Sequence, residues 1–249
     1  SEKNAGTYTV ELKGVTVGQT KSADDKYLVT EANPGELKVW PNDKETTITI
    51  TGKSDELTYD GNEHIVSGYS IFASNDAFIE SDKGDIAFNG AAFVKGTDVN
   101  VNATGSVTSY KMGLSQTQFS YTGKNFSNVK FVVVDGYLKI KPKSVTLTSA
   151  SNSKEYDGTA LTDESVTSEG FLDGQGAKYS VTGSQTVPGD SENTFTYTLD
   201  ENTQAKNYVI NQVMGKLTVT ERVNKYDITV VANSNNVPMY TGGEYTAEG

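Results

Sequence analysis

Few side chains in this 249-residue chain are suited to catalysis: His64 is the only histidine, and there is no cysteine. A Ser-His-Asp triad or a multi-histidine metal site would have to be built around His64. That residue follows Tyr59-Asp60-Gly61 in a polar stretch typical of a turn, so we expect an exposed loop histidine. We predict that the chain is not an enzyme and has no catalytic residue.

Carboxylates are plentiful, with 32 Asp and Glu against 21 Lys and Arg. The pairs Asp24 with Asp25 and Asp82 with Asp85 offer oxygen ligands of the kind that calcium accepts. However, no segment has the spacing of a twelve-residue calcium loop. We therefore predict no metal site and no cofactor.

Aromatic residues gather in residues 64–91, among acids and glycines. Exposed aromatic side chains concentrate at binding surfaces. Tyr69, Phe72, Phe78 and Phe88 are therefore candidate contacts for a glycan or protein of a host or neighbouring cell. We favour a structural role for the segment, in which it forms an extra hairpin over a sheet edge or over the joint to the next unit.

The composition favours strands joined by turns, because Thr, Ser, Val, Tyr and Gly are abundant. The net charge of −11 opposes nucleic-acid binding, which needs clustered Lys and Arg. No apolar run approaches the ~20 residues of a membrane helix. We expect an all-β, monomeric protein that binds no nucleic acid and inserts into no membrane over this stretch.

An alternating strand followed by a Tyr turn occurs three times. Its apolar residues point to one face: Ile48 and Ile50, Val145 and Leu147, Ile228 and Val230. Two copies end in Tyr-Asp-Gly, where we expect a buried Tyr ring, an Asx-type turn at Asp and positive φ at Gly. The third copy, Tyr240-Thr241-Gly242, keeps only Tyr and Gly, which favours a structural role for the motif.

A pair of apolar runs around a glycine also occurs three times, and this pattern predicts a β-hairpin. The glycines are Gly35, Gly136 and Gly215. Alternation turns the apolar residues of each second run inward: Leu37, Val39, Leu138, Ile140, Leu217 and Val219. The same alternation places Lys38, Lys139 and Lys141 in solvent, which argues against a covalent Lys–Asn crosslink because that chemistry needs a buried lysine.

The spacing of these markers predicts a tandem array. Residues 93–105 align with 171–183 at an offset of 78 residues, whereas Tyr59 and Tyr156 are 97 residues apart, which places a 19-residue insertion between Tyr59 and Phe93. We predict the closing half of a repeat at 1–43, full repeats at 44–142 and 143–222, and the opening part of a further repeat at 223–249. Short connections between the units favour a stiff, elongated array.

The order KEYDGTALT, GFLDG, YSVTGSQT, GDSENTFTYTL, NYVI and GKLTVT in residues 154–220 resembles the MBG/YDG-type repeats of bacterial cell-surface proteins. The match spans nearly all of 143–222 and is weaker in 44–142, where the insertion interrupts it. The resemblance implies an extracellular, wall-associated, adhesin-like protein, often from Gram-positive bacteria. In such proteins the repeats hold a distal domain away from the cell.

About seven short strands in roughly 80 residues predict an immunoglobulin-like β-sandwich for each unit. A β-grasp-like unit is the alternative and would require a helix. The chain starts without Met and ends just after a motif that opens a unit, so we expect a window of a longer protein. The leading functional prediction is a structural stalk or spacer; the alternative is an adhesive module that binds through the aromatic insertion at 64–91.

Overall fold

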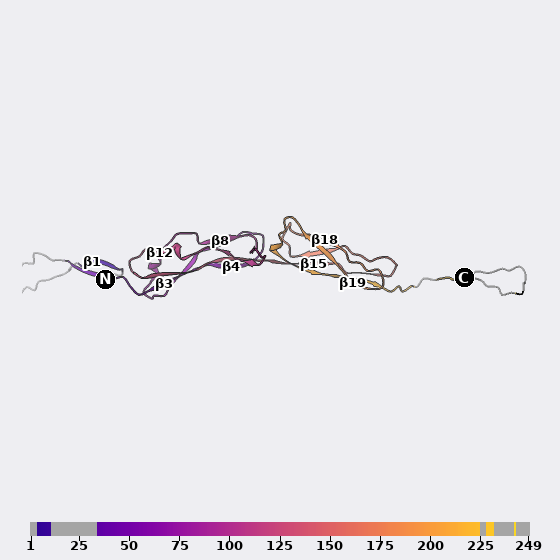
Figure 1. Cartoon of the computed structure of the whole chain (residues 1–249), viewed down its shortest axis with the longest axis horizontal. Helices are drawn as coiled ribbons and strands as arrows, with labels where there is room; N and C mark the ends of the chain where they lie inside the picture. Colours follow the sequence, from indigo (N-terminus) through magenta and orange to yellow (C-terminus); the bar gives the residue numbers. More distant parts are fainter. Residues whose placement is uncertain (1–3, 11–33, 225–227, 232–241, 243–249) are drawn as a thin grey trace, which may run out of the picture. The chain divides into compact units, whose positions relative to one another are not determined.

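The computed structural model describes residues 4–10, 34–224, 228–231 and 242 (Figure 1). These residues form twenty-two strands and three short 3-10 helices, and they include no α-helix. The prediction of an all-β protein is confirmed. Asp24, Asp25, Tyr240 and Thr241 lie outside the described residues.

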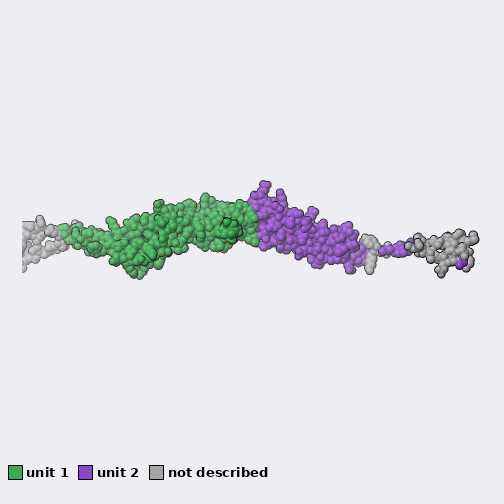
Figure 2. Space-filling model, viewed as in Figure 1, with its two compact units in different colours: residues 1–144, 204–209 green, residues 145–203, 210–249 purple. Residues whose placement is uncertain are grey.

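The chain forms two compact units, coloured separately in Figure 2. Unit 1 comprises Ser1–Ser144 together with Gln204–Val209, and unit 2 comprises Val145–Thr203 together with Ile210–Gly249. Residues 204–209 therefore belong to the second predicted repeat by sequence and to unit 1 by their contacts.

Unit 1 contains the first fourteen strands and two of the 3-10 helices. The strands are β1 (Gly6–Val10), β2 (Gly35–Val39), β3 (Thr46–Gly52), β4 (Ser54–Thr58), β5 (His64–Ser67), β6 (Tyr69–Ala73), β7 (Ile86–Phe88), β8 (Phe93–Gly96), β9 (Asn100–Val101), β10 (Val107–Thr108), β11 (Tyr110–Lys111), β12 (Phe119–Tyr121), β13 (Val129–Val134) and β14 (Tyr137–Lys141). The 3-10 helices are η1 (Glu80–Asp85) and η2 (Gln116–Gln118).

The remaining elements lie in unit 2 or continue into it, except for the short helix η3 (Ala205–Asn207), which is part of unit 1. They are β15 (Lys143–Ser149), β16 (Asn152–Glu155), β17 (Val166–Glu169), β18 (Ala177–Val181), β19 (Gly189–Asn193), β20 (Phe195–Leu199), β21 (Tyr208–Val213) and β22 (Gly215–Thr220).

The predicted hairpin around Gly136 is wrong. Strands β13 and β14 do not pair with each other; β13 pairs in parallel with β3, and β14 pairs in parallel with β4. Gly136 is not among the glycines with positive φ, so the chain does not make the tight reversal of a two-residue hairpin. A Cβ on Gly136 would lie 2.4 Å from the carbonyl oxygen of Lys53, so this glycine is needed where two backbones approach closely.

The predicted hairpin around Gly215 is also wrong, because β21 and β22 do not pair with each other. Strand β22 pairs in parallel with β16, and β21 joins the sheet of β15. A Cβ on Gly215 would lie 2.3 Å from the carbonyl oxygen of Ala150. Around Gly35, only the strand that begins there is described, and it pairs with β1.

Antiparallel strands complete four three-stranded sheets, with the orders β13-β3-β6, β11-β14-β4, β17-β15-β21 and β16-β22-β19. Ile50 of β3 lies opposite Ile71 of β6, and Leu147 of β15 lies opposite Ser168 of β17. The other five sheets have two strands each: β1-β2, β5-β8, β10-β9, β12-β7 and β18-β20.

Strand alternation locates the core correctly in most places. The residues that are at most 2% exposed include Ile48, Ile50, Leu138, Ile140, Val145, Leu147, Leu217 and Val219, as predicted. Leu37 is an exception at 40% exposed, because β2 has only β1 as a described partner. Ile228 and Val230 are also exposed rather than buried, at 83% and 87%.

The aromatic segment 64–91 does not form a separate hairpin. Its strand β5 pairs with β8, β6 pairs with β3, and β7 pairs with β12. The segment therefore contributes one strand to each of three different sheets of unit 1. The structural expectation of an extra hairpin is wrong in form, because the partners of these strands lie elsewhere in the unit.

Candidate functional site

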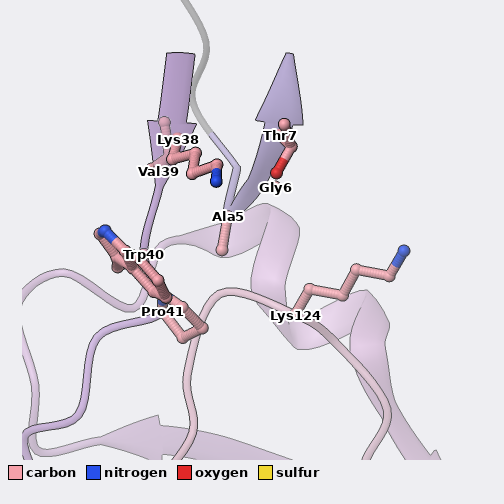
Figure 3. Close-up of a pocket in the computed structure, with 8 residues that line it drawn as sticks. All are labelled: Ala5, Gly6, Thr7, Lys38, Val39, Trp40, Pro41 and Lys124. Atoms are coloured by element: carbon pink, nitrogen blue, oxygen red, sulfur yellow. The ribbon is translucent and has the colours of Figure 1, made fainter. Parts of the chain in front are cut away.

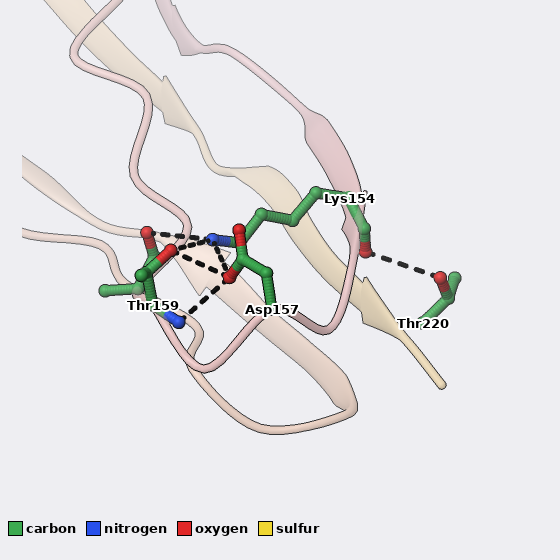
Figure 4. A network of polar contacts seen from close by, with 5 residues as sticks. Lys154, Asp157, Thr159 and Thr220 are labelled. Atoms are coloured by element: carbon green, nitrogen blue, oxygen red, sulfur yellow. Dashed lines mark hydrogen bonds and ion pairs between the residues drawn. The ribbon is translucent and has the colours of Figure 1, made fainter. Parts of the chain in front are cut away.

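The Tyr-Asp-Gly motif at residues 156–158 builds a closed polar turn (Figure 4). Asp157 Oδ1 accepts hydrogen bonds from the backbone N–H of Thr159 at 2.9 Å and from the Thr159 hydroxyl at 2.7 Å. The Lys154 ammonium lies 2.9 Å from the same oxygen. Lys154 and Thr159 together hold the pKa of Asp157 well below its ordinary range.

The first copy of the motif builds the same Asx-type turn. Asp60 Oδ1 accepts the backbone N–H of Asn62 at 2.9 Å and shares a hydrogen bond of 2.9 Å with His64 Nε2. These bonds lower the pKa of Asp60 to about 2. Gly61, Gly158 and Gly242 all have positive φ, between 76° and 85°, as predicted. Tyr59 is buried at 5% exposed, as predicted, whereas Tyr156 is only partly buried, so the prediction of a buried ring is wrong for the second copy.

The prediction of an exposed loop histidine is wrong, because His64 is the first residue of β5, and its side chain is about one-third exposed and has a partner in Asp60. The described residues contain no group of three or more His, Cys, Asp or Glu side chains arranged to hold a metal ion. Asp82 is only 3% exposed, and its carboxylate accepts hydrogen bonds from Asn125 Nδ2 and the backbone N–H of Ile79. Burial beside Asp82 and Asp85 raises the pKa of Tyr121.

Three of the four predicted aromatic contacts pack inside unit 1. The Tyr69 ring lies 5.4 Å from Phe88 and 5.3 Å from Phe119, measured between ring centroids. Phe78 lies 5.2 Å from Phe126 and 6.2 Å from Tyr121.

Phe72 is different, since its side chain is 70% exposed. The structure thus brings Tyr69 and Phe88 together, places Phe78 in a separate cluster and leaves Phe72 as the exposed member of the predicted set. Ligand contact by this set stays a prediction.

A Lys-Asn-aromatic sequence forms an amide clamp within unit 1. Asn207 Oδ1 accepts the backbone N–H of Val99 at 2.8 Å, and Asn207 Nδ2 donates to Asp98 Oδ1 at 2.8 Å. Lys206 lies 3.3 Å from the other oxygen of Asp98, and the ring of Tyr208 meets that of Tyr59 edge-on at 5.5 Å. Burial opposes ionisation of Asp98, but Asn207 and Lys206 lower its pKa overall.

A second clamp of the same kind occurs at Lys124-Asn125-Phe126. Asn125 Oδ1 accepts the backbone N–H of Ala5 at 2.9 Å, and Asn125 Nδ2 donates to Asn4 Oδ1 at 3.2 Å. The backbone N–H and C=O groups of Asn42 bond to Asn125 and Ser127. In both clamps a side-chain amide satisfies a buried backbone group that is more than 100 residues away in sequence.

A hollow of about 370 Å³ lies beside the second clamp, where β2 ends (Figure 3). We call it the Trp40 hollow. Its lining residues are Ala5, Gly6, Thr7, Lys38, Val39, Trp40, Pro41 and Lys124. The Trp40 side chain is 80% exposed, and Trp40 and Lys124 lie on opposite sides of Ala5.

Neither the two clamps nor the Trp40 hollow was predicted from the sequence. A signal for the clamps was present, because Lys-Asn-aromatic occurs at 124–126 and again at 206–208. The exposure of Trp40 could also have been predicted. Because Leu37 and Val39 were expected on the inner face of their strand, alternation places the next residue, Trp40, on the solvent face.

No protein-family model, curated protein or solved structure matches this chain. Within the described ranges, no helix combines the length and the apolar character that crossing a membrane requires.

Proposed function

We propose that this chain is a set of structural β-repeats that serve as a stalk or spacer in a bacterial cell-surface, adhesin-like protein. The observation that carries the proposal is the order of strand pairing. In residues 46–141, strands β3 and β4 pair in parallel with β13 and β14, respectively. In residues 143–220, β16 pairs in parallel with β22, and β15 shares a sheet with β21. Between β13 and β14, and again between β21 and β22, the chain passes from one sheet to another at a glycine that lies against a backbone carbonyl of the residues joining the two earlier strands.

The strand register also supports an equivalent arrangement of strands in the two proposed repeats. It further restricts where in the first repeat the 19-residue insertion lies. Ile50 and Leu147 are 97 residues apart, and so are their opposite residues, Ile71 and Ser168. Because Phe93 and Phe171 are only 78 apart, the 19 additional residues fall at 74–92. This segment supplies η1 and β7, so it adds a helix turn and one strand to the first repeat.

For the fold of each repeat, we favour an immunoglobulin-like β-sandwich over a β-grasp. Each proposed repeat contributes two three-stranded sheets built from different strands. A β-grasp unit needs a helix packed on its sheet, whereas the described helices are 3-10 turns of three to six residues. The interiors are formed by alternating strand residues, as expected for sheet packing.

The cellular setting of the proposal comes from the resemblance to MBG/YDG-type repeats, which implies an extracellular protein on the wall of a Gram-positive bacterium. We further propose that the chain is a monomer without catalytic activity or cofactor. The polar turns around Asp60 and Asp157 support a structural use of the motif, since each carboxylate is engaged by its own turn.

Two measurements test the proposal. Antibodies against this chain should label intact cells of the source organism, and small-angle scattering of the full chain should give an elongated envelope, as the short connections in the sequence predict. Labelling of permeabilised cells only, or a compact envelope, would count against a surface stalk.

The alternative proposal is an adhesive module that binds a glycan or protein through the segment 64–91. The exposure of Phe72 favours it, because a solvent-exposed aromatic side chain is available for contact. A glycan array probed with the full chain and with Phe72→Ala tests this directly. Binding that survives Phe72→Ala unchanged would contradict a role for this residue.

A further inference from the structure

Strand β2 is an incomplete copy of an arrangement that occurs twice more in the chain. Strand β14 lies between β11 and β4, and β22 lies between β19 and β16, whereas β2 has only β1 as a described neighbour. The antiparallel neighbours correspond, because each places one residue opposite the leucine of the closing strand: Tyr8 opposite Leu37, Tyr110 opposite Leu138, and Ser191 opposite Leu217. The neighbour that β2 lacks among the described residues is therefore the parallel strand, which β4 and β16 supply in the other two copies.

In both proposed full repeats this parallel strand comes from the opening motif, the alternating strand that runs into a Tyr turn. Strands β3 and β4 belong to the motif that starts at Ile48, and β15 and β16 belong to the motif that starts at Val145. The third copy of the motif starts at Ile228, and neither of the proposed full repeats uses it. One closing strand and one opening motif of this chain are thus left without a counterpart in those repeats.

Both of these segments expose positions that are buried in the proposed full repeats. Leu37 of β2 is 40% exposed, whereas the corresponding Leu138 and Leu217 are fully buried. Ile228 and Val230 are 83% and 87% exposed, whereas the corresponding residues of the full repeats have no exposed surface: Ile48, Ile50, Val145 and Leu147. Each segment therefore offers the apolar side chains that the other would cover, and burial of such side chains favours association.

We propose that β2 of one chain and the opening motif at Ile228 of a second copy together complete one repeat. A strand of the second copy extends the sheet at the edge of β2 that no described strand occupies, and Ile228 and Val230 of that copy are buried with Leu37. Strand addition of this kind pairs the backbone groups of an open sheet edge. The interface joins two different surfaces, so every added chain brings a further β2 and a further opening motif, and association continues head to tail.

This inference rests on the proposed order of the repeats, but it does not depend on a location at the cell surface. It restricts the proposed monomer to dilute solution. Its failure is distinguishable from failure of the stalk proposal, because antibody labelling of intact cells does not depend on contacts between copies.

Sedimentation equilibrium of the full chain tests the proposal. We expect the mean mass to rise from that of one chain, 26.7 kDa, to that of two or more chains as the concentration increases from about 1 μM to about 1 mM. A mass that stays at that of one chain up to about 1 mM would overturn the proposal, also if the two segments of a single chain meet each other instead.

Two single variants identify the two surfaces. Leu37→Asp alters β2 and Val230→Asp alters the opening motif, and each places a charge where the composite repeat needs an apolar side chain. Either variant alone should keep the mass of one chain. An equimolar mixture of the two should form dimers and nothing larger, because each variant supplies the surface that the other has lost.

The control is Val134→Asp, which places the same charge on an exposed residue of β13 and should associate as the unaltered chain does. Self-association of either Leu37→Asp or Val230→Asp would contradict the proposed interface. So would a mixture of these two variants that contains only single chains, or an equal loss of association in the control.

Discussion

At the scale of single residues, the glycines and aspartates of this chain have distinct backbone tasks. Gly61 and Gly158 supply positive φ after an Asx-type turn, while Gly136 and Gly215 permit two backbones to touch. The first task was visible in the sequence, because Tyr-Asp-Gly is a local signal. The second was not, since the atoms that crowd Gly136 belong to residues 52, 53 and 112, which are far from it in sequence.

Replacing Gly136 by Ala should destabilise unit 1 strongly. The new Cβ would lie 2.4 Å from the Lys53 carbonyl oxygen and 3.0 Å from the Met112 methyl carbon, so backbone must shift. Overpacking of this kind costs about 1 to 3 kcal/mol. Denaturant unfolding of Gly136→Ala measures the loss, and Gly84→Ala is the matched control because no atom lies within 4 Å of its added Cβ. Equal stability of the two variants would contradict the close approach.

The lowered pKa of Asp60 predicts that the stability of the fold decreases as the pH falls. Its pKa is about 2 in the folded chain, against about 4 for an unperturbed aspartate, so the ionised carboxylate stabilises the fold above pH 4. That contribution is lost as the pH falls through 2. Calorimetric melting temperatures should therefore fall less between pH 4 and pH 2 in Asp60→Asn than in the unaltered chain.

The control for this measurement is Asp76→Asn, which removes an exposed carboxylate from the same unit. Its melting curve should follow that of the unaltered chain. The effect of Asp60 is modest, since the group is exposed and screened by solvent. Identical pH profiles for Asp60→Asn and the unaltered chain would show that the turn does not depend on the charge.

At the scale of strands and segments, periodicity predicted which residues are buried but not which strands pair. Ile48, Leu138 and Leu217 lie in the core where alternation placed them. The hairpin prediction failed because each apolar run pairs with a strand far back in the chain; Tyr137 bonds to Ser54, 83 residues earlier. Local turn signals cannot report such partners. The clamps were missed for the same reason, since Asn125 and Ala5 are 120 residues apart.

The four aromatic residues of the segment separate into three that pack against other rings and one, Phe72, that is exposed. Phe78→Ala should lower the stability of unit 1 by about 2 kcal/mol, because Phe78 loses its contacts with Phe126 and Tyr121. Phe72→Ala should change it by less than about 0.5 kcal/mol, since the ring is 70% exposed. Denaturant unfolding of both variants measures the two losses of stability. A large loss in Phe72→Ala would show that this ring is structural as well.

At the scale of the whole molecule, the division into units does not follow the order of the chain. Residues 204–209 come after most of unit 2 in sequence, yet their contacts belong to unit 1. Tyr208 packs on Tyr59, and the side chain of Asn207 accepts a hydrogen bond from the backbone N–H of Val99, which is fully buried. Unit 1 is thus completed by residues that are synthesised after the first strands of unit 2.

Asn207→Ala should therefore loosen unit 1 at Val99. The buried backbone N–H of Val99 would lose its acceptor, Asn207 Oδ1, which should lower the stability of unit 1 by about 1 to 3 kcal/mol. Hydrogen exchange of the Val99 amide in the full chain should accelerate by about five- to a hundredfold. The amide of Ala5, held by the other clamp at Asn125, serves as the internal control and should exchange as before. Unchanged protection of Val99 would mean that Asn207 does not complete this unit, whereas equal acceleration at both amides would indicate global rather than local destabilisation.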